Sequence, residues 1–110
     1  MQNVYDLAHE LARSLKETDQ YKDMKKFRDQ VNANESLKKM VDDFGALSVE
    51  LQSALMSGQQ PDEELMKKFQ ATQAIVMQDP TCAALLNAEM AFSTIIADIS
   101  SILTEAIDVK

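Results

Sequence analysis

The last part of the chain carries an apolar stripe that is too wide for a helix standing alone in water. From position 81 onward its members recur at steps of three and four residues: Leu85, Ala88, Phe92, Ile95, Ile99, Ile102 and Ala106. Further apolar residues widen the stripe: Leu86, Ile96, Leu103 and Ile107. This spacing is typical of a helix, and a helix that is apolar around much of its circumference must be covered on more than one side. Residues 81–107 therefore require partner surfaces.

Two helices are predicted in the first third of the chain. Asn3 and Asp6 form a start signal for an amphipathic helix of about four turns. Thr18 and Asp19 start a second, more polar helix that ends around residues 32–34. Its apolar stripe is narrow, so we expect this helix to lie at the periphery of the fold.

Two further helices precede the apolar one. A series of apolar residues predicts a helix over 34–57, which Gly58 ends. Pro61 suits the first position of the next helix, and Asp79 followed by Pro80 repeats this start signal. A helix over 34–57 is roughly 36 Å long, whereas a compact domain of this size has a radius of gyration of roughly 13 Å. The fold must be elongated.

Composition excludes most other architectures. The 110 residues include only two Gly and two Pro, whereas all-β folds need turn residues every eight to twelve positions. With 45% hydrophobic and 26% charged residues, the chain belongs among globular proteins and not among disordered ones. We predict a single all-α domain over residues 1–110, an elongated antiparallel helical bundle with two long helices that dimerisation completes.

The missing cover for the stripe predicts a homodimer. One chain supplies only one other helix of comparable length, over 34–57, and a closed two-fold dimer is the commonest way to bury two such stripes. We therefore expect the interface to use residues 34–57 and 81–107. The expected interface residues are Leu37, Phe44, Leu47, Leu51, Leu85, Phe92, Ile95, Ile99 and Ile102.

Charge is distributed unevenly along the chain. The net charge is -7, but residues 13–39 carry eight bases against five acids. The cluster Lys22, Lys25, Lys26 and Arg28 is a candidate docking face for a protein partner, and the alternative interpretation is an ordinary solvated helix face. A dimer would carry about -14, so we predict no direct binding of nucleic acid.

The apolar stretch from Ala83 to Leu103 is also long enough to suggest a membrane span. Glu89 and Asp98 would then lie within hydrocarbon, at a cost of a few kcal/mol each. The N-terminus lacks the basic and continuous apolar regions of a secretory signal. We predict a cytoplasmic protein that does not bind membranes.

Residues that could carry chemistry are scarce. One His and one Cys are too few for a zinc site or a carboxylate-bridged metal bundle, and Asp6 with His9 is better explained as a surface pair. Cys82 falls in the first turn of the last helix, where the helix dipole could lower the pKa of its thiol. A small enzyme or redox protein that uses Cys82 is therefore the alternative to our prediction of no catalytic, cofactor-binding or metal-binding residue.

Several short motifs resemble one bacterial family. They are the opening segment 3–11, Tyr21-Lys22, the turn 57–61 followed by Glu64-Leu65, and Asp98-Ile99. Together they resemble the YlbF/YmcA/YheA family of small helical proteins, most closely its YheA-like branch, the UPF0342 group. The resemblance implies an all-α cytoplasmic homodimer without known catalytic residues.

The same resemblance suggests a function. Some YlbF- and YmcA-type members are regulatory adaptors in competence, sporulation and biofilm formation, through a complex that influences messenger RNA processing. Those members associate iron–sulfur clusters through cysteines, whereas this chain has Cys82 alone and no cysteine near its C-terminus. We therefore expect no cofactor, and predict a non-catalytic adaptor that acts through a protein partner whose identity the sequence does not specify.

Overall fold

The computed structural model describes residues 3–108, and this range contains five α-helices and no strand. The helices are α1 (Val4–Lys16), α2 (Asp19–Asn32), α3 (Glu35–Met56), α4 (Glu63–Gln78) and α5 (Pro80–Ile107). The prediction of an all-α fold with two long helices is confirmed, since α3 has 22 residues and α5 has 28.

Side-chain caps begin the helices largely where the sequence predicted. Asn3, Thr18 and Asn34 each accept a hydrogen bond from the backbone N–H three residues ahead, at 2.9 to 3.1 Å. The expectation for Pro61 is wrong, because this residue precedes α4 and is not its first helical residue. Asp62 caps α4 by accepting a hydrogen bond from the Glu64 N–H at 3.3 Å.

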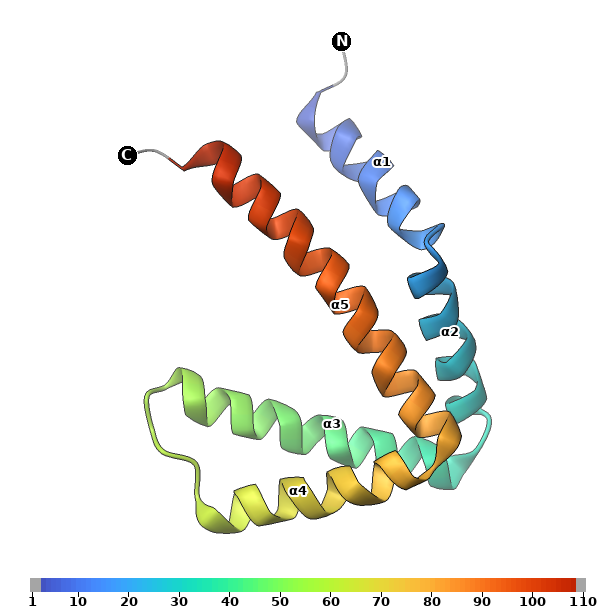
Figure 1. Cartoon of the computed structure of the whole chain (residues 1–110), viewed down its shortest axis with the longest axis vertical. Helices are drawn as coiled ribbons and strands as arrows, with labels where there is room; N and C mark the ends of the chain where they lie inside the picture. Colours follow the sequence, from blue (N-terminus) through green and yellow to red (C-terminus); the bar gives the residue numbers. More distant parts are fainter. Residues whose placement is uncertain (1–2, 109–110) are drawn as a thin grey trace.

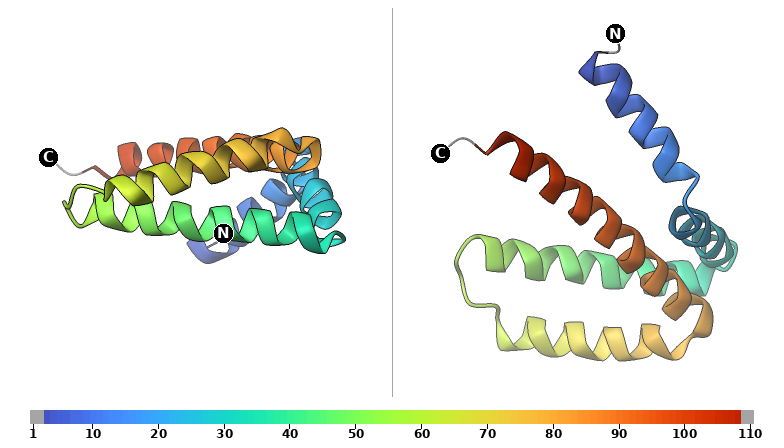
Figure 2. Two further views of the ribbon diagram at one scale, coloured as in Figure 1. Left: turned by 90° about the horizontal axis from the view of Figure 1, so that it is seen from below. Right: turned by 45° about the horizontal axis from the view of Figure 1, so that its top comes forward.

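The five helices form two arms that diverge from a common corner (Figure 1). One arm is the antiparallel hairpin of α3 and α4, and its turn passes through Gly58 at a φ of 78°, a left-handed conformation that suits glycine. The other arm contains α1 and the C-terminal part of α5. The described chain measures 52 × 37 × 16 Å, and its radius of gyration of 17.4 Å exceeds the roughly 13 Å of a compact domain. It is therefore elongated and flat, as Figure 2 shows.

The core lies at the corner where four helices meet. Its buried members come from α2, α3, α4 and α5: Val31, Val41, Val76, Cys82 and Leu85. Partly buried residues pack around them: Met24, Phe27, Leu37, Met40, Phe44 and Leu86. The core is thus confined to one end of each long helix.

The positions of α1 and α2 reverse what their sequences indicated. The expectation that α2 is peripheral is wrong, because α2 packs along α5 and its Val31 is fully buried. A narrow stripe suffices there, since the wide stripe of α5 covers it. The more amphipathic α1, all of which the structure describes, has no buried residue and leaves Val4, Leu7 and Leu11 exposed.

Candidate interaction surface

The main uncovered apolar surface lies on the arm formed by α1 and residues 90–107 of α5, which we call the distal arm. On α5, the side chain of Ile102 is 64% exposed and that of Leu103 57%, with Ile96 and Ile107 exposed beside them. This arm projects beyond the corner that holds the core (Figure 1). Apolar groups of this size left in water mark an interaction surface.

The predicted interface residues of α3 are largely used inside the chain. Leu37 and Phe44 pack against the core, and Leu47 is buried. Phe44 also stacks on Phe69 of α4, with 5.2 Å between the ring centroids. Leu51 is half-buried. Because α4 and the core cover most of these side chains, they are weaker candidates for a subunit interface than the sequence suggested.

The predicted interface residues of α5 divide between its two ends. Leu85 has no exposed surface, so the interface assignment of this residue is corrected: it belongs to the core of its own chain. The Phe92 ring meets the Tyr21 ring of α2 edge-on, with centroids 5.6 Å apart. Ile95 and Ile99 are half-buried, and Ile102 is exposed. Only the residues beyond Phe92 retain substantial surface for a partner.

The basic cluster on α2 does not form one face. The three lysines are exposed, whereas Arg28 is half-buried and turned toward α5. Each lysine has a neighbour within the chain. Lys22 lies 3.6 Å from a Glu17 oxygen, Lys25 lies 3.4 Å from an Asp29 oxygen, and Lys26 lies 5.2 Å from the centre of the Phe27 ring. The candidate docking face is thereby reduced to Lys22, Lys25 and Lys26.

Arg28 instead joins α2 to α5 through an ion pair that our sequence reasoning missed. Its Nη2 donates to Oε1 of Glu89 at 2.6 Å, and both side chains are about one-third exposed. The two residues are 61 positions apart, so helical spacing could not reveal the pair. It holds the corner together at the point where α5 leaves the core.

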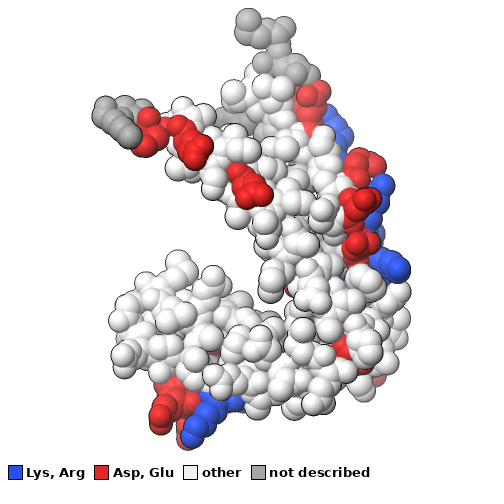
Figure 3. Space-filling view, viewed as in Figure 1, with Lys and Arg blue, Asp and Glu red and all other residues white. Residues whose placement is uncertain are grey.

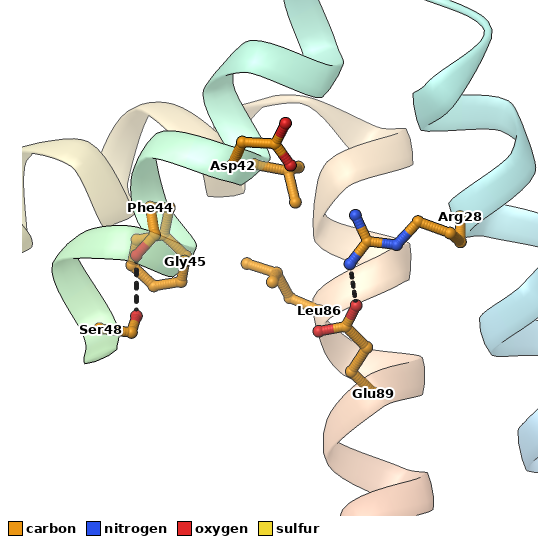
Figure 4. Close-up of a pocket in the computed structure, with 8 residues that line it drawn as sticks. Arg28, Asp42, Phe44, Gly45, Ser48, Leu86 and Glu89 are labelled. Atoms are coloured by element: carbon orange, nitrogen blue, oxygen red, sulfur yellow. Dashed lines mark hydrogen bonds and ion pairs between the residues drawn. The ribbon is translucent and has the colours of Figure 1, made fainter. Parts of the chain in front are cut away.

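The ion pair borders a cavity of about 330 Å³ between α3 and α5 (Figure 4). The Ser48 hydroxyl at its edge donates to the Phe44 carbonyl at 2.9 Å, and Asp42 accepts from Lys38 at 3.0 Å. Because the Ser48 hydroxyl and the Asp42 carboxylate are hydrogen-bonded to other groups and not to each other, the cavity contains no nucleophile paired with a base.

Cys82 does not have the environment of a reactive thiol. It is fully buried, and its pKa is raised from 9.0 to about 11, chiefly because burial removes water from the thiolate. A hydrogen bond to Asp79 and the negative charge of that carboxylate raise it further. The expectation of a lowered pKa is therefore wrong. Asp79 caps α5 by accepting from the Cys82 N–H at 2.9 Å, and so places an anion where the dipole alone would favour a thiolate.

Within residues 3–108, no three His, Cys, Asp or Glu side chains converge in a way that could hold a metal ion. By length and apolar composition alone, α5 could cross a membrane. Its first turns are instead part of the core, and Glu89 is paired with Arg28.

Comparisons with known proteins agree with this architecture. Residues 4–108 match the sequence model of a family described as control of competence regulator ComK, YlbF/YmcA. The chain is 37% identical over its whole length to a UPF0342 protein of Caldicellulosiruptor saccharolyticus, covering 92% of that protein. It is 38% identical to a UPF0342 protein of Alkalihalophilus pseudofirmus, over 98% of this chain and 92% of that one.

Two solved structures are also similar. The protein yheA from Bacillus subtilis superposes with a TM-score of 0.69 at 28% identity, over 96% of each chain. A protein of unknown function (DUF964) from Bacillus stearothermophilus has the same fold, with a TM-score of 0.80 at 19% identity over 96% of this chain and 93% of the other. The chain therefore belongs to the YlbF/YmcA/YheA family, in its YheA-like UPF0342 branch.

Proposed function

We propose that this chain is a non-catalytic regulatory adaptor that works through protein–protein contact, as a homodimer in the cytoplasm. One observation carries the proposal, namely the apolar surface that the distal arm leaves uncovered. An enzyme would instead be expected to place perturbed titratable groups in a pocket. Here the perturbed group is the buried thiol of Cys82, which is shifted away from reactivity at neutral pH.

Family membership supports the same proposal. The family description concerns control of a competence regulator, which is a regulatory task. We propose an adaptor role of the kind found among YlbF- and YmcA-type proteins, in competence, sporulation, biofilm formation or the control of RNA processing. The protein partner would bring the dimer to such a pathway, without direct contact between the dimer and RNA or a membrane.

The test compares three forms of the chain in cells that lack the native copy. His9→Ala/Cys82→Ala removes the two side chains on which the rival catalytic or redox function would depend, and we expect it to restore the parental phenotype. Lys25→Glu/Lys26→Glu reverses charge on the exposed side of α2, and we expect it to reduce recovery of the partner in affinity purification. Loss of the phenotype in the first variant, with wild-type folding, would favour the enzyme.

Direct RNA binding is measured separately, by fluorescence anisotropy with labelled RNA over a range of salt concentrations. We expect no appreciable binding. Tight binding that weakens steeply with salt would show that the α2 lysines contact phosphates.

A further inference from the structure

We propose that the distal arms of two copies pack together, so that α1 and residues 90–107 of α5 from each chain form a four-helix bundle. This inference deepens the homodimer that forms part of the proposed function, and rests on it. It assigns α1 a role that neither its sequence nor the family comparison indicated.

The first support is the continuity of the α5 stripe. Leu85 and Leu103 are 18 residues apart, which is about five full helical turns, so both lie on the same side of α5. Leu85 is fully buried by the core, yet Leu103 is 57% exposed. The same apolar side thus continues past the end of its own cover, and what covers it there must come from outside the chain.

The second support is that α1 presents a matching stripe on the same arm. Val4, Leu7 and Leu11 recur at steps of three and four residues, and all three are exposed. Each chain therefore brings two uncovered stripes, on two helices that project from the same corner. A two-fold axis between two such arms covers all four stripes at once, because the surface is then complementary to itself.

The third support is the position of the charges. Asp98 and Glu105 are rotated about 140–160° around α5 from Leu103 but only about 40–60° from Ile102, so they border the exposed apolar surface on its Ile102 side. Figure 3 shows this part of α5 with acidic side chains and no basic ones. Packing centred on Leu103 therefore leaves these carboxylates at the rim of the interface, in water, and a dimer avoids the cost of desolvating charges.

The size of the surface also suits a second copy. Residues 90–107 span about 27 Å, and this helix and α1, each about 10 Å wide, together offer a footprint of the same order as the roughly 800 Å² per partner of a standard interface. The hollow between the two arms in Figure 3 is the competing place for a partner, and its lining is mostly apolar or uncharged, including Met77 and Met90, with the one carboxylate of Glu89.

Charge insertion tests the assignment. Leu7→Asp and Leu103→Asp alter exposed positions, so each chain should keep its helical content by circular dichroism. We expect the parent to sediment as a dimer at micromolar concentration and both variants to dissociate at least about 100-fold more readily. The matched control is Ile75→Asp on α4, whose side chain is 55% exposed and lies about 160–200° around the helix from Gln73 and Met77 of the hollow. It should remain dimeric.

Cross-linking supplies a readout that does not depend on stability. Chains carrying Leu11→Cys and Ile102→Cys are mixed and treated with a short bismaleimide, while the buried Cys82 stays in place as an internal control. We expect a cross-linked pair that contains both variants, and none when Ile75→Cys replaces Ile102→Cys.

The outcomes separate the two proposals. Dimers that persist in both Asp variants without the cross-link would overturn the arm assignment while the homodimer stands. A cross-link from Ile102→Cys to Met77→Cys would place the second copy in the hollow instead. A parent that sediments as a monomer would overturn both the arm assignment and the homodimer, leaving the partner recovery experiment to decide the adaptor role.

Discussion

The two parts of α5, residues 80–89 and 90–107, share one apolar spacing but have opposite surroundings. Residues 80–89 lie in the corner of the fold, where Cys82 and Leu85 are fully buried. Residues 90–107 continue the same apolar side, but Ile102 and Leu103 are more than half exposed. The difference lies in what covers each half, since α2, α3 and α4 contribute to the core around the first half only.

Apolar periodicity thus identifies the side of a helix that must be buried, but it does not identify the residues that bury it. The first half finds its cover within the chain, through residues that are distant in sequence. The second half offers the same chemistry to a partner.

The largest difference is expected from truncating equivalent side chains in the two halves. Leu85→Ala should lower the free energy of unfolding by about 2–5 kcal/mol, because it opens a cavity in the core. Ile102→Ala should cost less than about 1 kcal/mol in dilute protein, and more as the concentration rises if a second copy covers it. Urea denaturation at two protein concentrations measures both, and equal losses in dilute protein would contradict the distinction.

The second prediction uses the thiol of Cys82 as a probe of the buried first half of α5. In the folded state the pKa of the Cys82 thiol is about 11, whereas its ordinary value is 9.0. The folded state therefore binds the thiol proton more tightly than the unfolded state does. The contribution of this thiol to stability is present below pH 9 and is lost as the pH rises from 9 to 11. We expect a loss of about 1–3 kcal/mol across this range.

Cys82→Ala is the control, because the difference between its pH profile and that of the parent isolates the thiol from other titrating groups. A cysteine introduced as Ile102→Cys should react with iodoacetamide at pH 8 much faster than Cys82 does. Similar rates for the two thiols would show that the first half is as open as the second.

The third prediction concerns the ion pair at the boundary between the halves. Arg28→Met should cost about 1 kcal/mol, a value already reduced for the partial exposure of both partners, since it leaves Glu89 half-buried without its cation. Lys38→Met breaks the exposed pair with Asp42 within one helix and should cost less than about 0.5 kcal/mol. A double-mutant cycle with Glu89→Gln measures the coupling, which would vanish if the pair contributes nothing.

The smallest effect is expected at the N-terminal cap of the distal arm. Asn3→Ala removes the acceptor for the Asp6 N–H, and should weaken α1 locally by about 0.5–1 kcal/mol. Because α1 has no buried residue, the midpoint of global unfolding in dilute protein should not move. Amide hydrogen exchange resolves the local change, and a shift in the global midpoint would show that α1 is part of the core.

Local signals in the sequence were sufficient for the elements themselves. Capping side chains at Asn3, Thr18, Asn34 and Asp79 act within three residues, and apolar spacing repeats every turn, so both can be read without tertiary contacts. The family could be identified from short motifs for the same reason. Only Pro61 was misplaced, because Asp62 next to it offers the better cap for α4.

The surface was predicted only in part. The sequence predicted that one chain could not cover the whole stripe of α5, and Ile102 is exposed within the chain. It could not show that Phe44 stacks on Phe69, which removes Phe44 from the candidate surface. It gave no reason to choose α1 in place of α3, since both helices carry apolar stripes and only packing decides which one the chain covers.

The sequence by itself determined the helices, their ends and the apolar side of each one, because these depend on neighbours within one or two turns. The tertiary structure alone decided which sides meet: α2 in the core, α1 outside it, Arg28 on Glu89, and Cys82 in a dry site beside Asp79. These outcomes depend on pairs of residues that are distant in sequence, such as Arg28 and Glu89, which are 61 positions apart. Their free energies come from burial and charge at the point of contact, and no periodicity along one helix encodes such a contact.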